Sequence, residues 1–457
     1  MNELDDLEDI MNTIVFEDEP SIFTEFYACE FIETALHLMD EYMNENPNIV
    51  TEPDFHDILF EEIQEIFYIQ FSEDIKNFDI IEYDIDELLE VAFNIYITSF
   101  YPERSINSSV ETYQQTDESI NTIEIKIQKL REIPQPVQRT QEWYQFRWNL
   151  ITASNAYKVF ESQATINQLI YEKCLPLKII NDTHKEEEIK MVNTNTPLHW
   201  GQKYEPLTVL LYEDKYDTKV EDFGCIQHPI YKFLGASPDG IIVNKDSNRY
   251  GSMLEIKNVV SRNITGIPKK EYWIQMQLQM EVCDLDKCDF LETKFVEYPD
   301  RYAYNDDIND NYQNTCLTKD GKQKGIIIYF HTKEGNPFYV YKPLDLIQAF
   351  QIQEWEENIV SLYQEQYKYT FLKFIYWKLD VFSCVLVLRN REWFKNCISQ
   401  IEKTWKIIEE ERISGYVHRA PNKKIKNDTA KPYVNNESSG CLLINKLIKI
   451  NTERNIN

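Results

Sequence analysis

Long hydrophobic runs are missing from this sequence. The longest candidate, Val381–Leu388, is far shorter than the roughly 20 residues that a membrane-spanning helix needs. The N-terminus is acidic and lacks the basic start and apolar block of a secretory signal. The nine cysteines are dispersed and form no Cys-x-x-Cys pair, which disfavours a structural zinc site. These absences predict reduced thiols, an intracellular location in the cytoplasm or nucleus, and no membrane partner.

Basic residues are almost absent from the first hundred positions. Residues 1–100 contain 28 Asp and Glu and one basic residue, Lys76, and so hold −27 of the formal net charge of −30. The rest of the chain is nearly balanced, so charge does not prevent residues 101–457 from binding DNA. Apolar residues recur at helical spacing over Ser21–Met43, Phe55–Phe71 and Asp84–Tyr101. We therefore expect an acidic helical domain over 1–101, serving as a solubilising or docking module, or as a surface that binds a basic protein or mimics DNA charge.

Composition divides the remainder further. Residues 102–138 are rich in Ser, Asn, Thr and Gln, which predicts a linker with one short helix around Ile123–Leu130. Residues 344–415 are aromatic and helical in pattern, so an all-α extension or oligomerisation element is expected over 344–417. The tail, 418–457, combines lysines with Asn and Ser and is expected to be disordered.

The most informative stretch runs from Gly235 to Lys257, GASPDGIIVNKDSNRYGSMLEIK. Asp239 lies in a Ser-Pro-Asp-Gly turn, and two short apolar segments around a polar loop predict a pair of strands. Glu255 and Lys257, two residues apart on a strand, share a face. Two carboxylates suit Mg²⁺ or Mn²⁺, and the lysine could hold an attacking water or neutralise a phosphate. The alternative is a surface hairpin with a solvated Glu–Lys pair.

A second stretch, TQEWYQFRWNLITASNAYKVF at 140–160, predicts two capped helices. Thr140 can cap a helix that ends near Asn149, and Thr152 or Ser154 can cap the next. Arg147 lies shortly before that second start. A helix N-terminus with a hydroxyl and an arginine nearby is typical of a phosphate pocket, but an ordinary pair of capped helices fits equally well.

Two further segments contribute polar side chains to apolar helices. Glu205 lies near the first turn of a helix that starts around His199, either as an acid favoured by the helix dipole or as a third carboxylate near the metal. In KEYWIQMQLQMEV, helical spacing places Gln275 and Gln279 on one face and Gln277 on another. Buried amides need partners, which phosphate oxygens or a metal-bound water could supply. The alternative is a helix with one polar edge.

Further strands are expected at Asp289–Glu297, at Gly325–Tyr329 and, paired with the latter, at Phe338–Tyr341. The fold class is therefore α/β (α+β), with a mixed central sheet flanked by helices.

The segments EWYQFRWNLITAS, GQKYE, GASPDG, LEIK and YWIQMQLQM follow one another over residues 141–280. This series resembles the phage lambda exonuclease / YqaJ viral recombinase family of the PD-(D/E)XK nuclease superfamily, over roughly residues 139–343. The resemblance implies a Mg²⁺-dependent (or Mn²⁺-dependent) 5′→3′ exonuclease acting on double-stranded DNA ends, often as a ring-shaped homo-oligomer, in viral recombination, repair or DNA defence. The many Asn, Ile and Lys and only 11 Gly would suit a large DNA virus.

The resemblance also implies roles for individual residues. The catalytic set would be Glu205, Asp239, Glu255 and Lys257. Asp239 and Glu255 would bind the metal with the Ile256 carbonyl, Lys257 would orient or activate the water, and Glu205 would lie at a second metal or in its outer shell. The residues that match the pocket for the 5′-terminal phosphate are Arg147, Ser154, Ser237 and Gln277, with Gln275 beside the site.

One departure from the family concerns a further aspartate upstream of the Ser-Pro-Asp turn. This chain reads Gln227-His228-Pro229 there, so a second metal would require His228 as a substitute. Some relatives hold an iron–sulfur cluster, but Cys283 and Cys288 alone cannot supply four thiolates. Alternative functions are an endonuclease or single-strand nuclease on the same core, or a catalytically idle DNA-binding or scaffold protein whose acidic domain docks a helicase, polymerase or annealing protein.

Overall fold

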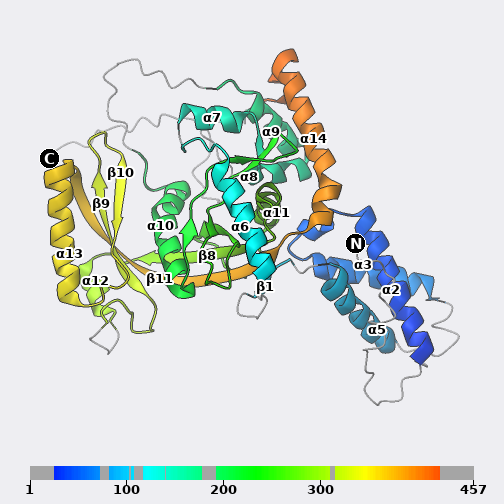
Figure 1. Ribbon diagram of the computed structural model, residues 1–457. Coiled ribbons are helices and arrows are strands. Elements are labelled where there is room, and N and C mark those ends of the chain that lie inside the picture. The colour runs from blue at the N-terminus through cyan, green and yellow to red at the C-terminus, as the bar shows by residue number, and fades with distance from the viewer. Residues whose placement is uncertain are drawn as a thin grey trace, which may run out of the picture.

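The computed structural model describes residues 25–72, 82–101, 104–107, 117–138, 140–177, 192–308 and 314–421. Figure 1 shows three parts along the molecule: a group of N-terminal helices, a central sheet with helices around it, and a sheet extension that carries α13. The acidic first residues, the Lys/Glu run at 185–190 and the basic tail from residue 422 lie outside the described residues. No described helix is long and apolar enough to cross a membrane.

The central sheet has eight strands and mixes parallel with antiparallel pairs, as the sequence predicts. Its order is β10-β9-β11-β8-β7-β6-β3, and β1 pairs with β11 beside this path. Only β7 and β8 are parallel among these pairs; the others are antiparallel. The strands are β1 (Ile106–Asn107), β3 (Val220–Glu221), β6 (Gly240–Ile242), β7 (Met253–Asn258), β8 (Lys287–Glu297), β9 (Lys324–His331), β10 (Pro337–Tyr341) and β11 (Thr370–Leu388).

Two helices cover opposite faces of β7. Helix α11 (Lys270–Cys283) connects β7 to β8, as a parallel pair requires, and its apolar residues pack with Met253. Helix α10 (Pro197–Tyr216) packs on the other face, where Leu254 meets Tyr212. Alternate residues of β7 therefore face different helices, and Glu255 and Lys257 share the α11 side with Met253.

A small three-stranded sheet lies beside the central one. Strand β5 (Leu234–Ala236) pairs in parallel with β2 (Ile151–Thr152) and antiparallel with β4 (Ile226–Gln227). The helices of this part are α7 (Gln141–Trp148), α8 (Ala153–Ala156), α9 (Gln163–Cys174) and α14 (Arg391–Ser414). The Thr140 hydroxyl accepts a hydrogen bond from the Trp143 backbone N–H at 3.2 Å, so the predicted cap at the start of α7 is confirmed.

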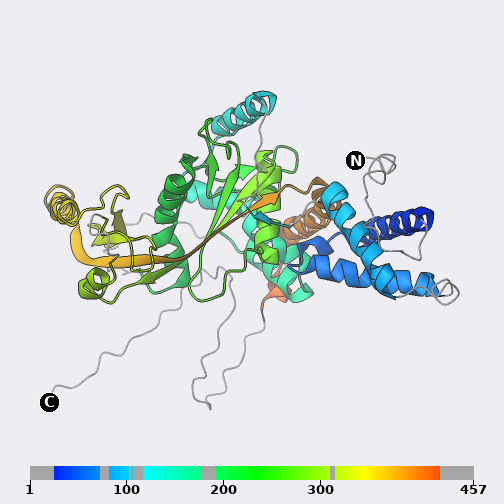
Figure 2. The same ribbon diagram turned by 90° about the horizontal axis from the view of Figure 1, so that it is seen from below.

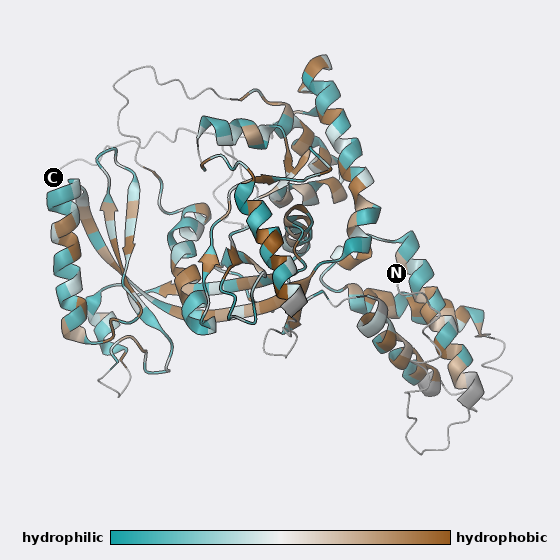
Figure 3. Ribbon diagram, in the orientation of Figure 1, coloured by the Kyte–Doolittle hydropathy of each residue, from teal (hydrophilic) through white to brown (hydrophobic). Residues whose placement is uncertain are grey.

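The N-terminal segment is helical, as its apolar periodicity predicts. Helices α2 (Glu25–Glu45), α3 (Phe55–Gln70) and α5 (Glu82–Ile95) bury their apolar sides against one another. The predicted short helix of the following segment is α6 (Asp117–Glu132). Buried Arg104 joins the N-terminal helices to the core, because its guanidinium donates to the carbonyls of Val50, Thr51 and Pro268. Figure 3 shows both hydrophobic and hydrophilic colour along these helices, as one-sided burial requires.

The expectation that residues 344–415 are all helical is wrong in its middle. Helices α13 (Ala349–Leu362) and α14 are present, but Thr370–Leu388 forms the 19-residue strand β11. This strand pairs with both β8 and β9, and Figure 2 shows it running across the molecule. A strand with neighbours on both sides reads as a nearly continuous apolar and aromatic run, which periodicity alone does not distinguish from a buried helix. The central sheet therefore includes residues beyond position 343.

Candidate active site

Asp239 and Glu255 meet where two strands separate. Strands β6 and β7 pair only at Gly240 with Leu254 and at Ile241 with Met253. Asp239 precedes the first of these residues, and Glu255 follows its partner. The Asp239 carboxylate accepts a hydrogen bond from the Ile256 backbone N–H at 2.7 Å, in the place where a further strand bond would lie. The turn predicted from Ser-Pro-Asp-Gly thus fixes a carboxylate against the edge of β7.

Gly240 is required for this arrangement. A Cβ atom built on Gly240 would lie 2.1 Å from Val220 Cγ1 of β3. Only glycine lets the strand pass this close to β3 immediately after Asp239.

Glu255 is completely buried under α11, and both of its carboxylate oxygens are bonded. Lys257 and Gln275 contact Oε1, the latter at 2.7 Å, and Gln279 Nε2 donates to Oε2 at 2.7 Å. The predicted shared face of Glu255 and Lys257 is therefore confirmed. Because burial of a charge is costly unless it is paired and hydrogen-bonded, these partners hold Glu255 in place.

The cluster carries more acid than base. Burial, with the negative charges of Glu255 and Glu205, raises the pKa of Asp239 well above its usual range, although Lys257 acts in the opposite direction. Burial alone would lower the pKa of Lys257, but Glu255 and Asp239 outweigh it and raise that pKa. Lys257 therefore stays a cation at neutral pH, and its side chain is 23% exposed. Asp239, Glu255 and the nearby Glu205 outnumber the single amine of Lys257. Negative charge is therefore left uncompensated beside the partly exposed Lys257 side chain.

Metal binding requires oxygen ligands that converge. No group of three or more His, Cys, Asp and Glu in the described ranges is arranged to hold a metal ion by itself. Asp239 and Glu255 supply two carboxylates, and the Ile256 carbonyl leaves β7 by the same edge as the N–H that Asp239 accepts. In addition, buried Gln279 Oε1 has no hydrogen-bond partner among the described residues. Acidic and carbonyl oxygens beside excess negative charge fit a hard divalent cation.

Glu205 approaches this cluster from the other helix. It is exposed on α10, and its charge raises the pKa of Asp239 and contributes, after burial, to the raised pKa of Tyr341. The structure thus places Glu205 near Asp239.

Ser154 and Ser237 lie at one end of the small sheet. Thr152 pairs with Gly235 in the parallel β2–β5 ladder, and each serine lies two residues further along its chain. Ser154 is exposed after the first residue of α8, and its hydroxyl lies 3.3 Å from Thr152 Oγ1. The Ser237 carbonyl accepts from Gln279 Nε2 at 3.3 Å, which links this end to Glu255. Thr152 is the N-cap residue of α8 but makes no side-chain cap bond.

Arg147 belongs to a cluster of three cations. Its guanidinium lies over the Trp143 ring at 4.6 Å, and its carbonyl accepts from Lys173 Nζ at 2.8 Å. Burial, reinforced by Arg147 and Arg412, lowers the pKa of Lys173 to about 7. Burial raises the pKa of Cys225, and nearby Arg147 opposes this.

This cluster is linked to the serines by strand pairing. Cys225 precedes Ile226, which pairs with Ala236, and so lies opposite Ser237. The structure therefore places Arg147 on the Ser237 side of the small sheet.

The sequence did not single out Lys173 or Arg412. Arg412 of α14 donates to the carbonyls of Trp148 and Lys173, which lie in the last turns of α7 and α9. No local motif marks it, because it reaches this place only through the packing of α14.

The three glutamines of α11 divide as helical spacing predicts. Gln275 and Gln279 bind Glu255, but Gln277 does not join them. Its amide donates to the Leu388 carbonyl at 2.8 Å and accepts from the Asn390 N–H at 2.7 Å. The structure therefore assigns Gln277 to the junction of β11 and α14, and the placement in the phosphate pocket that the resemblance implied is not supported. Gln279, which occupies the site instead, was signalled by its spacing of four from Gln275.

His228 is not brought to the cluster either. It is 4% exposed, and its Nδ1 accepts from the backbone N–H groups of Ile230 and Tyr231 at 3.1 and 3.0 Å. Burial, followed by the charges of Arg389 and Lys232, lowers the pKa of His228 to about 4. His228 therefore closes a turn as a neutral ring, and the structure gives no support to a second-metal role.

The part of the chain that forms this site is similar to a known protein family. Residues 142–286 match the model of the YqaJ-like viral recombinase domain. This part of the chain is similar to that domain. The resemblance drawn from the motifs is thus confirmed, and the matched residues include Arg147, Glu205, Asp239, Glu255 and Lys257.

The chain is also similar to a protein of a large virus. An uncharacterised protein of Acanthamoeba polyphaga mimivirus is 27% identical over 314 residues, which cover 62% of this chain and 54% of that protein. The chain thus spans about half the length of this curated relative.

Three solved structures of exonucleases show similarity to the chain. The alkaline exonuclease LHK-Exo from Laribacter hongkongensis has a TM-score of 0.34 and 20% identity, covering 61% of this chain and 97% of that one. Its complex with dAMP has a TM-score of 0.33 and 18% identity, covering 60% and 94%. A phage-related exonuclease from Haemophilus somnus has a TM-score of 0.29 and 13% identity, covering 57% and 94%.

Proposed function

We propose that this chain is a divalent-metal-dependent deoxyribonuclease, and more specifically a 5′→3′ exonuclease that acts on double-stranded DNA ends. One observation carries the proposal: Asp239, Glu255 and Lys257 converge at the separation of β6 and β7, inside the YqaJ-like domain. Phosphodiester hydrolysis needs a held phosphate, an activated water and compensation for negative charge that develops on the phosphate.

The residues that would hold Mg²⁺ or Mn²⁺ are Asp239, Glu255 and the Ile256 carbonyl, with Glu205 at a second metal or in the outer shell. When bound, the cation would lower the pKa of a water and polarise the phosphoryl oxygen. Lys257 is the cation that the chain itself supplies. Its amine would orient the attacking water and offset charge on the phosphate, while Gln275 and Gln279 keep the Glu255 carboxylate from rotating.

The preference for DNA ends would come from the neighbouring cation cluster. Arg147 lies on the Ser237 side of the small sheet, with Lys173 and Arg412 around it. Together with Ser154 and the Ser237 backbone, these groups would bind a 5′-terminal phosphate. A terminal phosphate held there would fix which phosphodiester reaches Asp239, so cleavage would proceed from an end.

The test is digestion of end-labelled linear duplex DNA in Mg²⁺ by the wild type, Asp239→Ala and Lys257→Ala. Asp246→Ala and Lys245→Ala are matched controls, because both residues are exposed in the loop between the same two strands. We expect digestion by the wild type and both controls, none by the two site variants, and none in EDTA. Wild-type-like digestion by either site variant would remove the catalytic assignment.

Substrate geometry is tested separately. Arg147→Ala should slow digestion of 5′-phosphorylated ends more than nicking of closed circles, because circles present no terminal phosphate. Equal loss on both substrates would favour an endonuclease on the same core. Metal-dependent cleavage confined to single strands would favour a single-strand nuclease, and no cleavage at all a catalytically idle DNA-binding or scaffold protein.

The N-terminal helices support a protein partner. Residues 25–72 and 82–101 contain no Lys or Arg, so α2, α3 and α5 would repel DNA and attract a basic surface. We propose a basic partner, such as a helicase or annealing protein, and a homo-oligomeric nuclease. Removing residues 1–130 should leave cleavage intact if this part only docks partners, and light scattering of the full chain measures the oligomer.

A further inference from the structure

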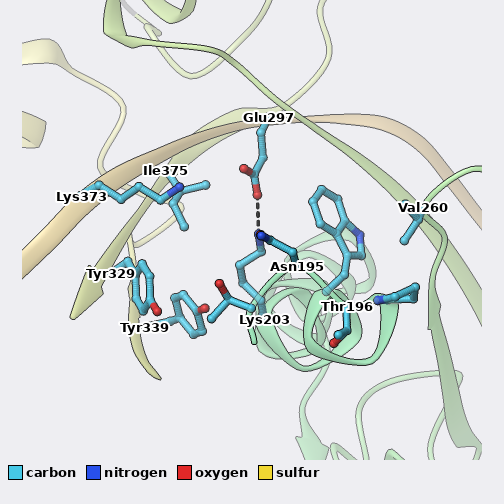
Figure 4. Close-up of a pocket in the computed structure, with 12 residues that line it drawn as sticks. Asn195, Thr196, Lys203, Val260, Glu297, Tyr329, Tyr339, Lys373 and Ile375 are labelled. Carbon is cyan, nitrogen blue, oxygen red and sulfur yellow. Dashed lines mark hydrogen bonds and ion pairs between the residues drawn. The ribbon is translucent and has the colours of Figure 1, made fainter. Parts of the chain in front are cut away.

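A cavity with a mixed polar and aromatic lining lies next to the candidate active site and has no part in the proposed nuclease mechanism. It encloses about 290 Å³ between the start of α10 and strands β9, β10 and β11 (Figure 4). Part of its wall comes from outside the matched residues 142–286, since Glu297, Tyr329, Tyr339, Lys373 and Ile375 belong to the C-terminal part of the sheet. The volume is at the lower limit of ligand pockets, which suits one small unit and excludes a duplex.

Aromatic rings form much of the wall. Tyr329 and Tyr339 are stacked with their centroids 4.9 Å apart, and Trp200 of α10 also lines the cavity. The Tyr339 hydroxyl is held by His199 Nε2 at 2.5 Å, which fixes the orientation of its ring. The buried Trp200 Nε1 has no hydrogen-bond partner among the residues that the structure describes. Planar aromatic rings in the wall suit a flat heteroaromatic ligand.

The charged groups divide into a neutralised pair and an exposed cation. Lys203 forms an ion pair with Glu297, which also accepts from the Tyr204 hydroxyl at 2.9 Å. Lys373 is exposed and enters the cavity from β11, on the side of Tyr329 in Figure 4. Thr196, the N-cap of the 20-residue helix α10, lies at the opposite wall. The exposed lysine favours an anionic group on its own side of the cavity.

The cavity is close to Asp239. The Tyr341 hydroxyl donates to the Lys203 carbonyl at 2.7 Å, and the Glu205 charge acts on both Tyr341 and Asp239. On the other side, Asn258, which follows Lys257 on β7, donates to the Gly201 carbonyl at 3.3 Å. The first turns of α10 therefore separate the cavity from the proposed metal ligands.

We propose that this cavity holds one unpaired nucleotide of a DNA strand at the active site, with its base against Tyr339 and Trp200 and its phosphate beside Lys373. The inference rests on the proposed function, because it takes DNA as the ligand. Ring stacking accepts any base, so the site would bind single-stranded DNA without sequence preference. Its role would be to keep the end of the duplex open while the neighbouring phosphodiester is cleaved.

The test is fluorescence anisotropy in EDTA with two labelled probes, a short oligothymidylate and a blunt duplex. The variants of the full chain are Tyr339→Leu, Tyr339→Phe and Lys373→Gln, and thermal melting monitors folding. Lys333→Gln is the matched control, because Lys333 is exposed at the end of β9 and does not line the cavity.

We expect Tyr339→Leu to weaken oligothymidylate binding about tenfold, as loss of one stacking ring does. Lys373→Gln should weaken it several-fold and reduce the salt dependence by about one ion. Tyr339→Phe, which keeps the ring, and Lys333→Gln should bind like the wild type, and blunt-duplex binding should change little in all four.

Oligothymidylate binding unchanged in both Tyr339→Leu and Lys373→Gln would overturn the inference, as would equal losses on both probes. Lys373→Gln keeps the test informative if Tyr339→Leu does not fold, because Lys373 is exposed. A wild type that cleaves no DNA but shows the expected selective losses would refute the proposed nuclease and retain the nucleotide site. A nuclease with unchanged binding in the variants would do the reverse.

Discussion

Two buried ion pairs have their acids on neighbouring strands and face opposite sides of the sheet. Arg249 pairs with Asp289 of β8 on the α10 side, where the Tyr212 hydroxyl also bonds Asp289. Lys257 pairs with Glu255 of β7 on the α11 side. The side chains of the first pair are 4% and 0% exposed, whereas Lys257 is 23% exposed.

Charge balance separates the two pairs. Arg249 and Asp289 match one to one, and Arg249 also lies over the Tyr216 ring at 3.7 Å. Around Lys257, by contrast, Asp239 and Glu255 share one cation, and Glu205 adds a third acid. A balanced, sealed pair holds structure together, while an acid-rich, partly open one stores an unfavourable charge that a bound cation would relieve. The difference identifies which of the two is the candidate functional site.

The largest effect should come from breaking the balanced pair. Arg249→Met leaves Asp289 buried without its cation and should lower the free energy of unfolding by about 3–5 kcal/mol. Urea denaturation measures this loss. Arg391→Met is the control, because Arg391 is 61% exposed in its pair with Asp286 and should change stability by about 1 kcal/mol or less. Equal losses would contradict a structural role special to Arg249.

The next effect concerns the acid-rich cluster. Asp239→Asn should lower the rate of duplex digestion by about 10²- to 10³-fold, the usual cost of removing one preorganised electrostatic group. Its stability without metal should not fall, because the substitution removes repulsion with Glu255. Asp246→Asn, an exposed change in the adjoining loop, should keep wild-type rates. A stable Asp239→Asn protein with full activity would contradict a functional role for the acid-rich cluster.

A smaller and more selective effect is expected from two glutamines of one helix. Gln279→Leu removes a hydrogen-bond donor from Glu255 and should lower the apparent affinity for Mg²⁺ by about 10- to 100-fold. Gln277→Leu instead leaves two backbone groups unpaired at the start of α14. It should lower the free energy of unfolding by about 1–3 kcal/mol and leave the apparent affinity for Mg²⁺ unchanged. Mg²⁺ titration of the digestion rate, alongside denaturation, compares them. Identical profiles for the two variants would refute the assignment.

The smallest effect is a pH dependence in the absence of metal. The pKa of Asp239 is raised in the folded chain, so the folded state binds this proton more tightly than the unfolded state does. Stability should therefore fall as pH rises from the usual aspartate range through the raised pKa. Asp239→Asn should lack this component, which the difference between the two denaturation profiles isolates. Parallel profiles would show that Asp239 carries no stored repulsion.

Local spacing predicted much of the site, because its central residues lie on regular elements. The shared face of Glu255 and Lys257 follows from a two-residue spacing, and that of Gln275 and Gln279 from a spacing of four. Helical spacing also places Gln277 on another face of α11, where it bonds Leu388 and Asn390. Spacing within an element gave the better guide here.

Contacts between segments far apart in the chain could not be predicted from local sequence patterns. The sequence predicts a helix where strand β11 lies, because its two neighbours, β8 and β9, come from earlier parts of the chain and no local period reveals them. The cation cluster around Lys173 depends in the same way on Arg412, which α14 brings across from the C-terminal side. The cavity at Tyr339 also joins α10 to strands more than a hundred residues later.

The central claim is that the acid-rich cluster beside Lys257 is a cation site. Calorimetric titration of Mn²⁺ into the DNA-free wild type and into Asp239→Asn at neutral pH tests it most directly. The account predicts saturable binding to the wild type, with binding to Asp239→Asn weakened at least about tenfold. Equal binding by the two proteins, or none by the wild type, would contradict it.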